Sequence, residues 1–287
     1  MAESANDTAV LLIDCPDQKG LVARVSSLLY QQNANILHAD QHQDHQLGLF
    51  FMRVEWALED GADLTAFIAA FTPLADELKM HWQLRRRNQK PRIALFCSQY
   101  LHCLADLLHR ASANELPCEI VVIISNHREA EALARFHNIR FEYISVTSAT
   151  RAAAETRQLA ILEELNVELV VLARYMQILT ESFVARYPAS IINVHHSFLP
   201  AFIGARPYHA AHARGVKLIG ATSHYVTTAL DDGPIIEQDV ARISHRDQVE
   251  DLVARGRDLE RIVLARALRW HLEHRILCYG NKTVVFD

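Results

Sequence analysis

Short apolar runs alternate with amphipathic segments through the middle of the chain, and this alternation most strongly constrains the fold. The first run, Arg92–Cys97, is apolar along almost its whole length, which is typical of a strand buried on both faces of a parallel sheet. Further strands are expected at 119–125, 141–145 and 169–173, with helices at 101–111, 129–136 and 152–165. Strands and helices that alternate in this way predict an α/β fold with a doubly wound, mostly parallel sheet.

A different pattern precedes this segment. Strands are expected at 8–13, 35–41, 47–54 and 80–86, and helices at 21–29 and 63–78, the second one interrupted at Pro73. The order βαββαβ is the ferredoxin-like pattern. Residues 88–91 are polar and end in a proline, as linkers do. The sequence therefore predicts a domain at 1–87, a linker at 88–91 and a second domain at 92–287.

Composition excludes several classes of protein. The net charge of −5 does not suit an electrostatic binder of nucleic acid. The N-terminus is polar and acidic, unlike a secretory signal, and no apolar run reaches the length of a membrane span. The five cysteines are scattered without a C-x-x-C pair, which favours reduced thiols. We therefore expect a cytoplasmic protein without nucleic-acid or membrane partners.

Polar groups suited to catalysis follow the apolar pair Ile191–Ile192. Asn193 and His195 are two residues apart, so on a strand both side chains point to the same side, into the cleft where open α/β sheets bind ligands. Asp231, in a turn before Gly-Pro, could bring a carboxylate to the same cleft. For either residue alone we favour a structural explanation, with Asn193 as a turn cap and His195 as a satisfied buried histidine. Amide, imidazole and carboxylate together indicate acyl transfer.

The segments 193–202, 220–226 and 230–236 resemble the formyltetrahydrofolate-using transformylases and hydrolases. The extension at 203–209 is similar to the formyltetrahydrofolate deformylase branch, and the resemblance covers essentially the whole chain. It implies a hydrolase of a linear amide C–N bond, which converts 10-formyltetrahydrofolate to tetrahydrofolate and formate. Such a reaction balances one-carbon pools and supplies formate for purine synthesis. The folate is the substrate, and no cofactor is expected.

The resemblance also implies a role for each polar residue. Asn193 would donate to the formyl oxygen, His195 would polarise that oxygen or shuttle the proton, and Asp231 would hold the attacking water. A slot for the flat pterin would lie beside them. Its expected lining residues are Arg174, Met176, Gln177, Ile178, Leu179, Gly204, Val226, Thr227 and Leu230. From the residues alone, Met176, Ile178 and Leu179 would be interpreted as core.

The N-terminal βαββαβ segment resembles the ACT domain, a small-molecule sensing unit found beside metabolic enzymes. Asp17, Gly20 and Leu21 match its loop-to-helix turn, and Asn33 matches its helix-to-strand turn. The free amides of a helix N-terminus suit a carboxylate, which predicts an amino-acid effector such as glycine or methionine. Asp17 equally well caps the helix and Gly20 relieves the turn, which leaves a pure assembly role open. The sheet edges of such a unit predict a homo-oligomer.

The segment 97–103 distinguishes water from an amine as the nucleophile. Transformylases that use a phosphorylated amine carry a glycine-rich loop there, whereas this segment has no glycine and contains bulky Tyr100 and Leu101. That favours a hydrolase. Three alternatives remain: a folate-dependent formyltransferase acting on an amine acceptor, a catalytically silent regulator, and a metal-dependent amidase suggested by the 16 histidines. No histidine cluster has a familiar ligand spacing, so no metal is expected.

Overall fold

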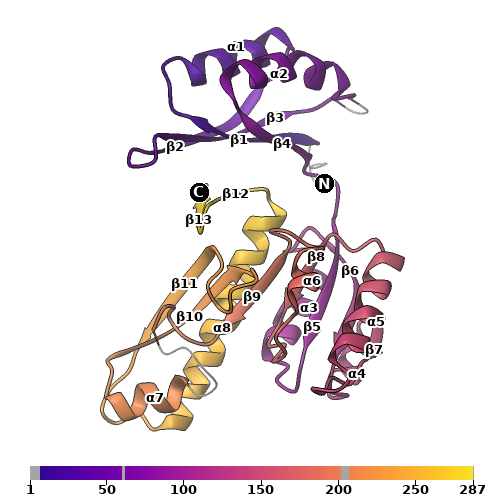
Figure 1. Ribbon diagram of the computed structural model, residues 1–287, viewed down its shortest axis with the longest axis vertical. Coiled ribbons are helices and arrows are strands. Elements are labelled where there is room, and N and C mark those ends of the chain that lie inside the picture. Colours follow the sequence, from indigo (N-terminus) through magenta and orange to yellow (C-terminus); the bar gives the residue numbers. More distant parts are fainter. Residues whose placement is uncertain (1–6, 60–61, 202–206, 287) are drawn as a thin grey trace. The chain divides into compact units, whose positions relative to one another are not determined.

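The computed structural model describes residues 7–59, 62–201 and 207–286. The chain divides into two compact units (Figure 1). The first unit contains Met1–Gln89 together with the C-terminal segments Glu273–Tyr279 and Val284–Asp287. The second unit contains Lys90–Leu272 and Gly280–Thr283. The sequence placed all residues after 91 in one domain, whereas contacts place two C-terminal segments with the first unit.

The first unit is built around a four-stranded sheet with the order β2-β3-β1-β4, in which all neighbouring strands are antiparallel. Its elements are β1 (Thr8–Pro16), α1 (Leu21–Gln31), β2 (Ile36–Asp44), β3 (Leu49–Ala57), α2 (Thr65–Leu78) and β4 (His81–Arg86). This order confirms the βαββαβ prediction. Helix α2 runs unbroken through Pro73, so the predicted interruption is wrong. Phe71, Leu74 and Leu78 of α2 pack into the core beside this proline and hold the helix in place.

Strand β1 explains how both faces of this sheet are covered. Ala9, Leu11 and Ile13 point to one face and pack under α1 and α2, which lie on the same side (Figure 1). Val10 and Leu12 point to the opposite face, because side chains alternate along a strand. There they pack against residues of the C-terminal strands β12 (Ile276–Tyr279) and β13 (Lys282–Val285). The C-terminal segments therefore complete the core of the first unit.

The second unit contains a seven-stranded sheet with the order β11-β10-β9-β8-β5-β6-β7. Its strands are β5 (Arg92–Cys97), β6 (Glu119–Ser125), β7 (Arg140–Tyr143), β8 (Leu169–Leu172), β9 (Ile191–His195), β10 (Leu218–Tyr225) and β11 (Ile235–Arg242). Its helices are α3 (His102–Ser112), α4 (Glu131–Phe136), α5 (Arg151–Glu164), α6 (Glu181–Val184), α7 (Pro207–Arg214) and α8 (Val249–Leu272). Strands β5 to β9 are parallel to one another, whereas β10 is antiparallel to both of its neighbours, β9 and β11. The predicted mostly parallel α/β sheet is confirmed.

Helices cover both faces of this sheet. Ala94 and Phe96 of β5 pack in one core cluster with residues of α5 and α6. The long helix α8 packs against α3, β9, β10 and β11. Within the described ranges, no helix combines the length and the apolar character needed to cross a bilayer. Because β5, β8 and β9 are parallel neighbours, their carboxyl ends meet at one edge of the sheet, where the site is expected.

Candidate active site

Strand β9 carries two of the three predicted catalytic residues to the same cavity. Asn193 and His195 lie at its carboxyl end and both line a cavity of about 310 Å³. Asp231, from the loop between β10 and β11, lines it too. The structure therefore brings together the amide, the imidazole and the carboxylate. His195 and Asp231 meet there although they are 36 positions apart in the sequence.

The imidazole of His195 and the carboxylate of Asp231 lie in contact inside the cavity. The His195 Nδ1 atom lies 3.3 Å from the Asp231 Oδ2 atom. The hydrogen bond with His195 lowers the pKa of Asp231 despite partial burial, so this carboxylate is ionised at neutral pH. On the other side of the ring, His195 Nε2 is buried without a hydrogen-bond partner among the described residues. This Nε2 atom is therefore the ring nitrogen left to exchange a proton with a ligand.

The loop that carries Asp231 has a backbone that few residues could form. Asp231 adopts a φ of 52°, in the left-handed region that Asp tolerates better than most residues. At Gly233, an added Cβ would lie 1.8 Å from the backbone oxygen of Tyr225, so only glycine fits there. The Tyr225 N–H donates to the Pro234 oxygen at 2.9 Å. This close approach of the loop to β10 holds the Asp231 carboxylate beside His195.

His224 is a site residue that sequence reasoning missed as a functional group. In the pairing of β10 with β9 it lies opposite Asn193, and its Nε2 is 3.2 Å from the Asn193 Nδ2. Its Nδ1 is 2.9 Å from the Tyr225 carbonyl oxygen, which can only accept, so Nδ1 carries the hydrogen. Burial lowers the pKa of His224, which favours the neutral ring. Its Nε2 therefore accepts a hydrogen bond from the Asn193 amide and fixes the orientation of that amide.

The residues predicted to line a folate slot lie around the same cavity. Those that the structure describes all line it: Arg174, Met176, Gln177, Ile178, Leu179, Val226, Thr227 and Leu230. Gly204 lies outside the described residues. Met176 and Ile178 are 48% and 54% exposed, so they are not core residues. Leu179 and Val226, by contrast, are partly buried and pack against the core under α5.

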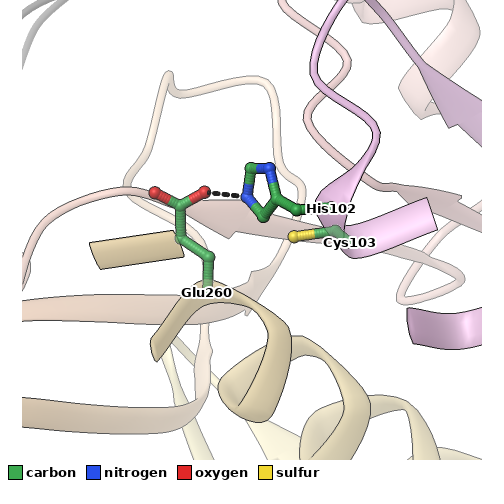
Figure 2. A group of neighbouring side chains, drawn as sticks. All are labelled: His102, Cys103 and Glu260. Carbon is green, nitrogen blue, oxygen red and sulfur yellow. Dashed lines mark hydrogen bonds and ion pairs between the residues drawn. The ribbon is translucent and has the colours of Figure 1, made fainter. Parts of the chain in front are cut away.

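A buried charged cluster adjoins this cavity through Arg174. Figure 2 shows His102 and Cys103 of α3 extending toward Glu260 of α8. Glu260 Oε2 lies 2.7 Å from His102 Nε2 and 3.4 Å from Arg174 Nε, and Tyr208 donates its hydroxyl to Oε1 at 2.7 Å. Burial raises the pKa of Glu260, but the His102 hydrogen bond and the Arg174 charge outweigh burial and lower it. Glu260 is thus an ionised partner inside the protein.

His102, Cys103 and Glu260 offer three ligand atoms of types that bind metal ions. Two features argue against a metal there. The guanidinium of Arg174 already lies against the same carboxylate, and its positive charge repels a cation. Burial also raises the pKa of the Cys103 thiol well above its ordinary value, whereas a metal ligand must be a thiolate. The arrangement fits an internal ion-pair network.

The predicted regulatory residues lie at the two ends of α1. Gly20, with a φ of 89°, precedes the helix and Leu21 is its buried first residue. Asn33, with a φ of 57°, follows the other end, and the 11 residues of α1 span about 16 Å. The Asp17 carboxylate bonds to the Gln43 side chain and does not cap α1. Within one chain, the two sets of residues are therefore apart.

Comparison with known proteins agrees with both halves of the fold. The family model for formyl transferase matches residues 91–268, and that for the ACT domain matches residues 9–56. A formyltetrahydrofolate deformylase of Synechocystis sp. is 54% identical over 282 residues, which cover 98% of this chain and 99% of the relative.

Solved structures of two kinds of protein match the chain over different shares of its length. A formyltetrahydrofolate deformylase of Pseudomonas syringae pv. tomato matches with a TM-score of 0.96 and 48% identity, covering 100% of this chain and 96% of that one. The glycinamide ribonucleotide transformylase 1 of Symbiobacterium toebii matches at 0.65 with 30% identity, covering 69% of this chain and 95% of its own. The chain therefore belongs to the formyltetrahydrofolate deformylase family, with an ACT domain ahead of a formyl transferase domain.

Proposed function

We propose that this chain hydrolyses 10-formyltetrahydrofolate to tetrahydrofolate and formate, with Asn193, His195 and Asp231 at the reacting carbonyl. The observation that carries the proposal is the convergence of these three side chains on one cavity. The relatives that the chain matches over nearly its full length carry the name formyltetrahydrofolate deformylase, and this supports the choice of substrate.

In the proposed mechanism, one N–H of the Asn193 amide is occupied by His224, and the other donates to the formyl oxygen. This donor stabilises the negative charge that develops on the oxygen as water attacks. Asp231 Oδ2 faces His195, and its Oδ1 lies 3.9 Å from His224 Nε2, too far for a hydrogen bond. Oδ1 is thus available to hold the attacking water.

His195 Nε2 moves the proton in this scheme. It accepts a proton from the water as the C–O bond forms, and the ionised Asp231 stabilises the imidazolium through Nδ1. It then returns the proton to the leaving nitrogen as the C–N bond breaks, which gives the amine and formate. No group outside the chain is needed for either step, so we propose that the reaction requires no metal or other cofactor.

The pterin ring would lie in the slot formed by the loop after β8 and the loop after β10. Exposed Met176, Ile178 and Leu230 line the cavity and offer apolar surface to a flat ring. Burial of such surface by the ring is favourable, at roughly 25 cal/mol for each Å² removed from water. Arg174, Gln177 and Thr227, with Gly204 from outside the described residues, complete the set that we propose to contact the substrate.

We further propose that the ACT domain binds an amino acid, with glycine and methionine as the first candidates. The residues matched to the ACT turns lie at opposite ends of α1, so one small ligand could contact both sets only if two copies of the chain contribute. This supports a homo-oligomer. The five cysteines are free thiols, which supports a cytoplasmic location for the enzyme.

The decisive experiment is formate release from 10-formyltetrahydrofolate in the absence of any amine, with and without an excess of chelator. We expect turnover under both conditions. If turnover appears only when an amine is added, the reaction is formyl transfer to that amine and the proposed hydrolysis is wrong. Turnover that is lost on chelation and restored by one metal ion would overturn the metal-free mechanism. The Asp231→Asn variant is the control for a contaminating hydrolase, because it should release almost no formate.

A further inference from the structure

The strand order of the second unit places β8 and the residues that follow it between the loop after β5 and the candidate active site on β9. Strand β8 lies between β5 and β9 in the sheet. An amine acceptor held by the loop after β5 must therefore cross the carboxyl end of β8 to reach a formyl group at Asn193 on β9. Arg174 lies at that end, two residues after β8, and lines the same cavity as Asn193 and His195.

The Arg174 side chain is fixed where it lies. It is 8% exposed, and its Nε is 3.4 Å from the Glu260 carboxylate. His102 and Tyr208 contact the same carboxylate, as Figure 2 shows for His102, so Glu260 is held from three sides. A long side chain normally loses rotamer freedom when it is buried, and here an ion pair in a poorly hydrated interior opposes its release.

The loop after β5 is joined to Arg174. The Ser98 N–H donates to the Arg174 backbone oxygen at 3.1 Å, and the Met176 N–H donates to Ser98 Oγ at 3.0 Å. The guanidinium carbon of Arg174 lies 5.7 Å from the centre of the Tyr100 ring, and that of Arg257 lies 5.6 Å from it. Bulky groups thus fill the region between the loop and the end of β8.

One donor of Arg174 points to a small polar neighbour. Whereas Nε faces the Glu260 carboxylate, the terminal nitrogen Nη1 is buried without a hydrogen-bond acceptor among the described residues. A buried donor without a partner is unfavourable, so it favours a ligand that can accept a hydrogen bond. Beside a bulky side chain, a water molecule meets this requirement, whereas an amine with substituents needs the space that the guanidinium occupies.

We propose that Arg174, held by Glu260 and Tyr100, is a specificity-determining residue that excludes amine acceptors and leaves water as the nucleophile. The inference rests on the proposed deformylase activity. In the excluded reaction, the amine nitrogen would bond to the formyl carbon while the bond from that carbon to the folate nitrogen breaks. The amine proton would pass to the folate nitrogen, giving an N-formyl amine in place of formate.

The test is the product ratio of Arg174→Gly with 10-formyltetrahydrofolate and glycinamide, a small primary amine. Arg174 has a φ of 63°, a conformation that glycine adopts readily, so this substitution removes the side chain without backbone strain. Mass spectrometry gives N-formylglycinamide and formate in one sample. We expect only formate from the parent, and at least a tenfold higher ratio of N-formylglycinamide to formate from Arg174→Gly. Arg174→Lys, which keeps a long cation, should retain the parent ratio.

A folded Arg174→Gly variant that forms formate with the parent product ratio would overturn the proposal. If this variant has no turnover, calorimetric titration of glycinamide in the presence of tetrahydrofolate decides instead. Binding to Arg174→Gly but not to the parent supports the proposal, and equal binding or no binding to both overturns it. Failure of the proposed function gives a different result, because the parent itself would then release no formate without an amine.

Discussion

The two sets of residues that motifs single out behave differently in the folded chain. Asn193, His195 and Asp231 come from two segments of the second unit and meet in one cavity. Asp17, Gly20 and Asn33 come from one short segment of the first unit, yet the helix α1 separates Asp17 and Gly20 from Asn33. Residues close in sequence can thus be far apart, and distant ones can share a site, according to the element that carries them.

The two sets of residues also differ in how deeply their side chains are buried. His195 and His224 are buried and have defined partners in the Asn193 and Asp231 side chains. Asp17 and Asn33 are exposed. Buried polar groups need fixed partners, because an unmet hydrogen bond in the interior is costly. The proposed catalytic site is therefore preformed by the chain itself, whereas the proposed effector site depends on a second copy.

The largest expected effect comes from Asp231→Asn. The change keeps the size of the side chain and removes the charge that supports His195, so hydrolysis should fall by roughly two to four orders of magnitude. Formate release by the purified variant measures this. The neighbouring Asp232 is exposed, so Asp232→Asn is a matched control that should retain the parent rate. Near-parent turnover of folded Asp231→Asn would remove this carboxylate from the mechanism.

The second prediction is that the free energy of unfolding depends on pH through His274, which lies in the C-terminal segment of the first unit. Burial and the nearby charges of Arg85, Arg53 and Arg87 lower the pKa of His274 to about 4. In the unfolded chain the pKa of His274 is near 6.5. Between pH 4 and pH 6.5 the unfolded state therefore binds a proton on this ring that the folded state does not bind. This contribution to stability is complete above about pH 6.5 and is lost as the pH falls toward 4. Between pH 7.5 and 5 the loss is about 2 kcal/mol.

His274→Asn isolates that contribution. The residue has a φ of 52°, which Asn tolerates, and Asn cannot titrate. Urea unfolding, followed through the fluorescence of Trp56 and Trp82 in a Trp270→Phe background, should show a pH-dependent change in unfolding free energy that is about 2 kcal/mol smaller in the variant. An equal pH dependence in both proteins would mean that His274 is already hydrated or charged in the folded state.

Substitution of His224 tests whether a buried partner sets the orientation of the Asn193 amide in the proposed catalytic site. In His224→Leu the Asn193 amide loses the acceptor that orients it, so kcat should fall by roughly tenfold to a hundredfold, less than for loss of an oxyanion donor. The KM should change little, because His224 does not form the pterin slot. His224→Gln offers a carbonyl oxygen to the same amide and should recover part of the rate. A raised KM with unchanged kcat would contradict the orienting role.

The sequence predicts best where a single element carries the signal. Strands β5 and β6 begin and end at the predicted residues, because apolar runs buried on both faces have clear limits. The hydrogen bond between His102 and Glu260 joins residues 158 positions apart, and no local pattern announces it. The function of His224 depends on the register between β9 and β10. The C-terminal strands pack on β1 for reasons of tertiary burial, which periodicity does not encode.

The smallest expected effect concerns the exposed residues of the first unit. If Asn33 contacts an amino-acid effector, Asn33→Gly should abolish the change in formate release that saturating glycine or methionine causes in the parent, roughly fivefold for a coupling at the low end of the usual range. Glycine tolerates the φ of 57° at this position, so only the side chain is lost. The matched control is Asn138→Gly. Asn138 is also exposed, follows a helix and has a φ of 56°, but it belongs to the second unit.

The two variants make the same chemical change at similar backbone positions, so a general effect of glycine on stability should appear in both. Loss of the response in Asn33→Gly alone would place the effector at the helix end that the ACT turns predict. A response that persists in Asn33→Gly would move the effector site away from this residue. A parent enzyme that ignores every amino acid would leave α1 and its flanking turns as an assembly surface, since their exposed polar side chains would then have no ligand to recognise.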